Sequence, residues 1–163
     1  MECMNCGAEM TTKRESVQYK SLPGTVLQGV EVSRCPKCGA VETAIPAIEQ
    51  LNQLLAKHVI EKPGRLNGGE IRFLRTFLGY SGADFAKIIG SNASTVSRWE
   101  SDAQPMGNHA DLLLRALVII GKKVKSYPIE RFAELATEDA PVKPVPTYFK
   151  RHSKTWRQTE VAA

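Results

Sequence analysis

Hydrophobic and polar positions follow two different patterns along the 163-residue chain. In the first part, residues 16–20 and 25–33 alternate partly between apolar and polar side chains, which predicts two strands joined by a Pro-Gly turn. Over residues 45–59 apolar side chains recur every three or four positions, and this period predicts a helix that ends before Pro63. The first part is therefore expected to form a β-hairpin followed by one helix.

From residue 69 onward the apolar positions keep the helical period and are interrupted by turn residues. The spacing predicts five short helices, over residues 69–78, 81–89, 92–101, 108–120 and 128–135. The last 27 residues contain three prolines and few aliphatic side chains, which predicts a flexible basic tail. We expect a first domain over 1–62, a linker over 63–68, a helical domain over 69–136 and a tail over 137–163.

The formal charge of +5 is divided unevenly among these segments. Residues 1–62 carry seven basic and seven acidic side chains, whereas residues 63–136 carry ten against seven and residues 137–163 carry five against three. Positive charge on the helical domain and tail is compatible with a nucleic-acid partner. The sequence shows neither an apolar run of about 20 residues nor a secretory signal, so we expect a cytoplasmic protein.

All four cysteines lie in the first domain, in two CxxC pairs that are each followed by glycine. The first pair is Cys3 and Cys6, and the second is Cys35 and Cys38. A two-residue gap lets two thiolates converge on one side of a tight turn, and the glycine permits the positive φ that such a turn favours. Four thiolates complete the tetrahedral shell of a structural Zn²⁺ site. The sequence therefore predicts one zinc ion per chain, with disulfides or a redox dithiol as the alternatives.

A closed metal shell also limits the chemistry that we expect. Such a site has no open position for a reacting water, and the chain has no His-x-Glu deaminase pattern or other nucleophile–base pair. The metal is instead expected to stabilise a domain that is too small and too poor in large apolar side chains to fold without it. We therefore expect a binding protein and no enzyme.

Residues 81–100, SGADFAKIIGSNASTVSRWE, have the spacing of a helix-turn-helix. Ala86 is small where two helices cross closely, Gly90 falls in the turn, and Val96 points back into the core. The segment resembles the Cro/repressor type, whose pattern ends in Ser-Arg-Trp-Glu or Ser-Arg-Tyr-Glu. The predicted fold is thus α+β, with a small N-terminal zinc-ribbon-like β-hairpin domain with a helix, followed by an all-α five-helix domain of the Cro/repressor type.

The second helix of such a motif lies in the major groove and contacts bases through its first residues and its outward face. The candidate DNA-binding residues on this face are Asn92, Ser94, Ser97 and Arg98. Arg98 is the best candidate for a bidentate bond to guanine, and Asn92 is equally suited to cap the helix. Trp99 is expected in the core rather than against a base. Gly82 stands where the motif often has a glutamine that contacts DNA.

The order of these parts resembles the MqsA family of antitoxins, with its YgiT-type zinc finger. The resemblance covers residues 1–136 and depends on two CxxCG motifs followed by the Ser-Arg-Trp-Glu helix-turn-helix. It implies a zinc domain that binds a small ribonuclease toxin and a C-terminal domain that dimerises and represses the shared operon at a palindromic operator. It also implies that the four cysteines bind zinc and that Ser94 and Arg98 contact bases.

The expected partners are accordingly double-stranded operator DNA, a cognate small toxin and a second copy of the chain. Apolar side chains cover more than one face of the helix over 108–120, so part of its surface needs a cover from the fifth helix or from a partner subunit. A stand-alone regulator with no toxin is the alternative function. Aromatic and basic residues that alternate in the tail suit a nucleic acid or a protein partner, and a solvated end is the alternative.

Overall fold

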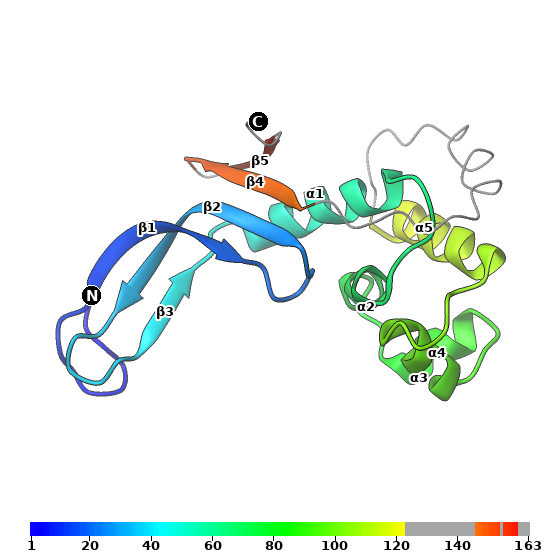
Figure 1. Ribbon diagram of the computed structural model, residues 1–163, viewed down its shortest axis with the longest axis horizontal. Coiled ribbons are helices and arrows are strands. Elements are labelled where there is room, and N and C mark those ends of the chain that lie inside the picture. Colours follow the sequence, from blue (N-terminus) through cyan, green and yellow to red (C-terminus); the bar gives the residue numbers. More distant parts are fainter. Residues whose placement is uncertain (123–145, 154, 160–163) are drawn as a thin grey trace. The chain divides into compact units, whose positions relative to one another are not determined.

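The computed structural model describes residues 1–122, 146–153 and 155–159, and these contain five helices and five strands (Figure 1). The chain divides into two compact units. One unit comprises Met1–Lys20, Gly24–Leu51 and the two C-terminal strands, and the other comprises Ser21–Pro23 and the chain from Asn52 through the last described helix.

The first unit is built on a mixed five-stranded sheet. Its strands are β1 (Thr11–Gln18), β2 (Thr25–Arg34), β3 (Val41–Ala44), β4 (Thr147–His152) and β5 (Thr155–Thr159). Strand β1 pairs with β2 along one edge, while the opposite edge of β2 is shared between β3, which pairs antiparallel, and β4, which pairs parallel. Strand β5 completes the order β1-β2-β4-β5 by pairing antiparallel with β4.

A bulge in β2 lets this strand bury more of its apolar side chains than a regular strand would. The register shifts where two residues of β2, Gln28 and Gly29, lie opposite Ser16 of β1. Gly29 has φ of +74°, a conformation that glycine adopts without strain. Leu27 and Val30 consequently point to the same side of the sheet, and both are fully buried.

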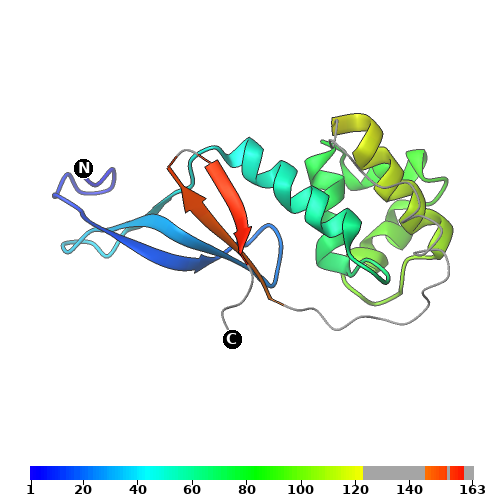
Figure 2. The same cartoon turned by 90° about the horizontal axis from the view of Figure 1, so that it is seen from above.

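The two C-terminal strands show that the expected all-α C-terminal region was wrong. In Figures 1 and 2, β4 (orange) lies beside β2, although more than a hundred residues separate them in the sequence, and β5 (red) lies on the far side of β4. Phe149 and Trp156, which the sequence placed in a flexible tail, are only 1% and 2% exposed. The aromatic and threonine residues of this segment favour strands, and this preference outweighs the basic and proline-rich composition around them. The fifth helix expected over 128–135 lies outside the described residues.

The helices follow the expected order from residue 48 to residue 122. They are α1 (Ile48–Glu61), α2 (Gly68–Phe77), α3 (Gly82–Ile88), α4 (Ala93–Glu100) and α5 (Asn108–Lys122). Helix α1 begins in the first unit and continues into the second. Within the described ranges, no helix combines the length and the apolar character that crossing a membrane requires.

Side-chain caps explain where three of these helices begin. Asn67 and Glu70 form a reciprocal capping box at α2, in which each side chain accepts a hydrogen bond from the backbone N–H of the other. Ser81 accepts from the backbone N–H of Asp84 at the start of α3. Asn92 caps α4 in the same way. These caps satisfy N–H groups that have no partner inside the helix.

Candidate metal centre and nucleic-acid interface

The two CxxC turns have the same backbone geometry. In Cys3–Ala8 and in Cys35–Ala40, the N–H of the first cysteine donates to the carbonyl of the alanine at 2.9 Å. The glycine after each pair, Gly7 or Gly39, donates to the carbonyl of the first cysteine and has φ of +70° or +74°. The repeated sequence CxxCGA thus folds twice into one turn, as the positive φ at each glycine requires.

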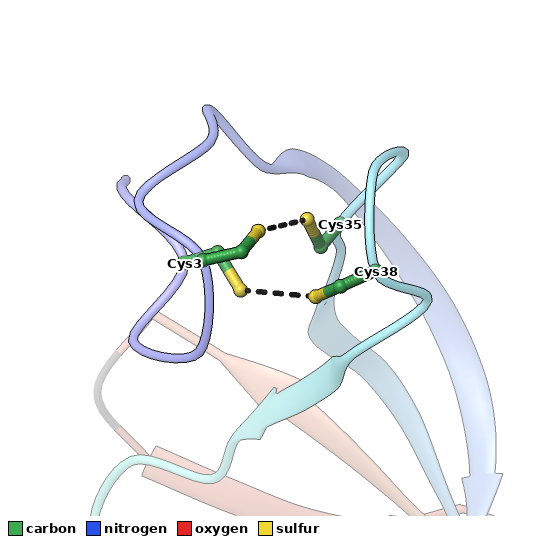
Figure 3. Close-up of side chains that lie close together, drawn as sticks. Cys3, Cys35 and Cys38 are labelled. Carbon is green, nitrogen blue, oxygen red and sulfur yellow. Dashed lines mark hydrogen bonds between the residues drawn. The ribbon is translucent and has the colours of Figure 1, made fainter.

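These turns bring all four sulfurs together, as the sequence predicted. The Sγ atoms of Cys3, Cys6, Cys35 and Cys38 all lie within 4.8 Å of one another. Figure 3 shows Cys3 facing the sulfurs of the second turn. The Sγ atoms of Cys3 and Cys38 are 3.6 Å apart, and those of Cys6 and Cys35 are 3.4 Å apart. A tetrahedral site with Zn–S bonds of about 2.3 Å has sulfurs roughly 3.8 Å apart. The four thiols therefore form a cluster that could hold a metal ion.

No disulfide joins these four cysteines, and hydrogen bonds make their sulfurs chemically unequal. The backbone N–H of Ala8 lowers the pKa of Cys6, but the neighbouring thiols and partial burial outweigh it and raise the pKa to about 12. At Cys38 the backbone N–H of Ala40 and the side chain of Asn5 lower the pKa to about 6. These hydrogen bonds favour the thiolate form of Cys38, which is the form that binds a metal.

The pair α3 and α4 has the inward-facing residues that the sequence predicted. Ala86 of α3 is buried, and so are Val96 and Trp99 of α4. Gly90, in the turn between the helices, has φ of +69°. Because these positions fix which side of α4 faces inward, the opposite side of the helix is turned to solvent.

Three of the four candidate DNA-binding residues, Ser94, Ser97 and Arg98, lie exposed on α4. Asn92 acts as a cap, since its Oδ1 accepts from the backbone N–H of Thr95 at 2.8 Å. The same Oδ1 also accepts from the hydroxyl of Ser94 at 2.7 Å. Arg98 donates from Nε to the carbonyl of Ser94 at 3.3 Å, so its guanidinium lies back along the exposed face. Ser97 and Arg98 are therefore the polar side chains on this face that take no part in the N-cap of α4.

An ion-pair cluster fixes the end of α4 to α2. Glu100 is nearly buried, and both of its oxygens accept from Arg75, at 2.5 Å from Nε and 3.2 Å from Nη2. Arg72 adds a bond of 3.2 Å to the same carboxylate. The helix-turn-helix motif includes Glu100 but neither arginine, so it did not predict this cluster. The two arginines lie three residues apart and therefore on one face of their helix.

A close backbone contact fixes the same two helices. An added Cβ at Gly68 would lie 2.6 Å from the carbonyl oxygen of Glu100 and 2.7 Å from that of Trp99. The N–H of Gly68 donates to Oδ1 of Asp102 at 2.6 Å. Gly68 was expected in a linker, but α2 begins at this residue, against the end of α4. Gly68 and Asp102 thus position the helix that carries Arg98.

No model of a known protein family matches the chain, and no curated protein matches its sequence.

Proposed function

We propose that the protein is a DNA-binding transcriptional repressor of the antitoxin type. The observation that carries this proposal is the short helix α4, which buries Val96 and Trp99 and presents Ser97 and Arg98 to solvent. A helix held in this way by a preceding short helix suits insertion into the major groove. The surrounding contacts of Gly68 and Glu100 keep α4 rigid, and rigidity lowers the cost of ordering the helix on DNA.

Arg98 is proposed as the main reader of base sequence. Its guanidinium can give two parallel hydrogen bonds to guanine O6 and N7 once it leaves the carbonyl of Ser94. Ser97 supplies a hydroxyl that serves as donor or acceptor, and Ser94 is proposed as a weaker contact because its hydroxyl is bonded to Asn92. Asn92 is proposed to stay at the cap and to bring the N-terminus of α4 close to a phosphate.

We propose Zn²⁺ as the ion of the four-cysteine cluster and a structural role for it. An all-thiolate tetrahedral set favours zinc over hard cations such as Mg²⁺ and Ca²⁺. Cys3 and Cys35 are buried with Met10 in a small apolar cluster. Because this cluster contains few other large side chains, the ion would supply much of the stability of the two turns.

A small toxin protein is proposed as the partner of the unit that carries the metal. This proposal depends on the motif order described for the sequence, and the charge of the region supports it. Residues 1–62 are formally neutral, and one Zn²⁺ with four thiolates gives about −2 if every ligand is deprotonated. That charge suits a basic ribonuclease better than it suits DNA.

A second copy of the chain is proposed as the third partner. Ile120 of α5 is 79% exposed, and Leu113 is also exposed, seven residues earlier on the same side of the helix. Pairing of two copies would place two α4 helices on successive half-sites of a palindromic operator.

Two experiments test this function. Footprinting of the purified protein on the DNA upstream of its own gene should show a protected palindrome with two half-sites about one helical turn apart. Affinity purification from cells that express the neighbouring genes should recover a small basic protein. Protection without a co-purified protein would favour the stand-alone regulator, and absence of protection would overturn the repressor proposal.

A further inference from the structure

The C-terminal hairpin, defined here as β4 and β5, occupies a place in the first unit that no nearby segment of the chain fills. Residues 147–150 of β4 pair in parallel with residues 25–28 of β2, and the N–H of Thr147 donates to the carbonyl of Gly24 at 3.1 Å. Figure 2 shows the hairpin along this edge of the sheet, next to the start of α1. The edge of β2 is thus completed by a segment from the far end of the sequence.

Two aromatic side chains anchor the hairpin. Phe149 lies in register with Leu27 of β2, and both side chains are buried. Trp156 is buried as well, and its indole N–H donates to the carbonyl of Pro46 at 2.9 Å. The backbone N–H of Trp156 donates to Oε1 of Gln50 at 3.2 Å. The surface that receives the hairpin therefore combines the edge of β2 with the buried side chain of Leu27. It also offers two acceptors, the Pro46 carbonyl and Gln50 Oε1, which both bind N–H groups of Trp156.

One ion pair between the hairpin and β2 adds to the specificity of this contact. Arg151 lies 3.6 Å from Glu31 of β2, which also pairs with Arg14 of β1 at 3.2 Å. Backbone pairing, aromatic anchors and a charge at a fixed position are the elements by which a sheet edge recognises an added strand. The hairpin brings its own second strand, since residues 148–152 of β4 pair with residues 155–159 of β5.

We propose that this edge of β2, with Pro46 and Gln50, is a strand-docking groove whose ligand is the C-terminal hairpin, and that the hairpin of a second copy can take the same place. The hairpin acts as an intramolecular ligand because residues 123–145 connect it to α5. A ligand on the same chain binds in an intramolecular step, which keeps the groove filled by the hairpin of the same chain in dilute solution. When the tether is cut, a free hairpin can enter the groove of any copy. At high protein concentration the hairpins of intact copies exchange. Exchange would link two chains through their first units, independently of any contact between α5 helices.

The test uses the full chain with a protease site inserted among residues 123–145, so that the tether is cut after the protein has folded. The probe is a fluorescein-labelled synthetic peptide of residues 146–160, followed by fluorescence anisotropy. The matched control peptide carries Phe149→Ala and Trp156→Ala, which remove both anchors and leave the backbone and charges unchanged.

The cut protein should bind the native peptide saturably, and the uncut protein should bind it at least about 50-fold more weakly because the tethered hairpin competes. The control peptide should bind the cut protein at least about tenfold more weakly than the native peptide does, because it lacks both buried aromatic side chains. Equal binding of the two peptides, or no binding of the native peptide to the cut protein, would overturn the proposal.

A second variant covers the case in which the inserted site prevents folding. The full chain with Phe149→Ala and Trp156→Ala has a weakened hairpin of its own and needs no cleavage. It should bind the native peptide more tightly than the unmodified chain does. If both chains show the same affinity for the peptide, the groove is not a docking site and the proposal is wrong.

Discussion

Arg115 and Asp111 form an ion pair in the interior of the second unit, one turn apart on α5. The Nε of Arg115 lies 2.5 Å from Oδ1 of Asp111, and the two side chains are 0% and 7% exposed. An aspartate followed four residues later by an arginine is a common ion pair on helix surfaces. Here both charges are removed from water. Such a pair is tolerated only when further hydrogen bonds satisfy the remaining polar atoms.

Those further bonds tie α5 to the end of α1. Arg115 donates to the carbonyl oxygens of Ile60, Lys62 and Gly64, at 2.8 to 3.0 Å. The second oxygen of Asp111 accepts from the backbone N–H of Leu66 at 2.8 Å. The pair therefore caps the C-terminal end of α1, where helix carbonyls lack partners and positive charge is favourable.

Replacing Arg115 by methionine should destabilise the second unit strongly. The substitution keeps most of the side-chain volume but leaves the carboxylate of Asp111 buried without a cation, which typically costs about 3–5 kcal/mol. The measurement is urea unfolding followed by helical circular dichroism. The matched control is Lys57→Gln, which removes an exposed charge 3.8 Å from Glu61 and should change the free energy of unfolding by less than about 0.5 kcal/mol. Similar effects of the two substitutions would contradict the role given to Arg115.

Gly68→Ala should disturb the contact between α2 and α4. The added methyl group would meet two backbone carbonyls, and overpacking of this kind costs roughly 1–3 kcal/mol. Gly82→Ala is the control, because a Cβ there has no neighbour within 4 Å. The control should be neutral or slightly stabilising. Thermal unfolding distinguishes the two, and equal melting temperatures would show that the close approach at Gly68 is not maintained in solution.

Glu100→Gln should weaken the attachment of α4 while keeping the shape of the side chain. The neutral amide cannot accept charge-assisted bonds from Arg72 and Arg75 as the carboxylate does, and bonds to charged groups contribute about 1.5–3 kcal/mol each. Hydrogen exchange should therefore show faster opening of the α4 amides, with little change in the first unit. Unchanged protection of α4 would indicate that the ion-pair cluster contributes nothing to its position.

Cys35→Ser should lower the bound metal from one ion per chain to well below one and unfold the turns of the first unit. The reason is that three thiolates leave the shell incomplete and the small cluster around Met10 lacks other large side chains. Met4→Ala is the control, because Met4 lies between Cys3 and Cys6 in the other CxxC turn and is 94% exposed. Metal analysis together with hydrogen exchange gives the readout. Full metal content in Cys35→Ser would remove this cysteine from the ligand set.

Short-range patterns in the sequence predicted much of the two sites. The two CxxCG motifs fix their own turns, because each glycine permits a positive φ, and they predicted the four-cysteine cluster. The helical periods and the caps Ser81 and Asn92 depend on neighbours within four residues. These features could be predicted because the residues that determine them lie close together in the chain.

The contacts between distant residues could not be predicted in the same way. The parallel pairing of Phe149 with Leu27 depends on two segments more than a hundred residues apart. Parallel strands are not joined by a hairpin turn, so no turn residues in the sequence indicate which strands will pair. Arg115 interrupts an apolar run in the sequence, and nothing local shows that three carbonyls of a distant helix end satisfy it. Gly68 likewise carries no local sign of the helix end that approaches it.

Binding to the DNA upstream of the gene tests the central claim most directly. Fluorescence anisotropy at one fixed salt concentration should compare the unmodified protein, Arg98→Ala and Arg14→Ala, which removes the same charge from the exposed surface of the first unit. Loss of one bidentate contact costs about 1–3 kcal/mol, so Arg98→Ala should weaken specific binding roughly 5- to 150-fold and flatten the preference at one base pair per half-site. Arg14→Ala should leave binding and preference unchanged. Equal affinities of all three proteins for the site would contradict the proposal that α4 reads DNA.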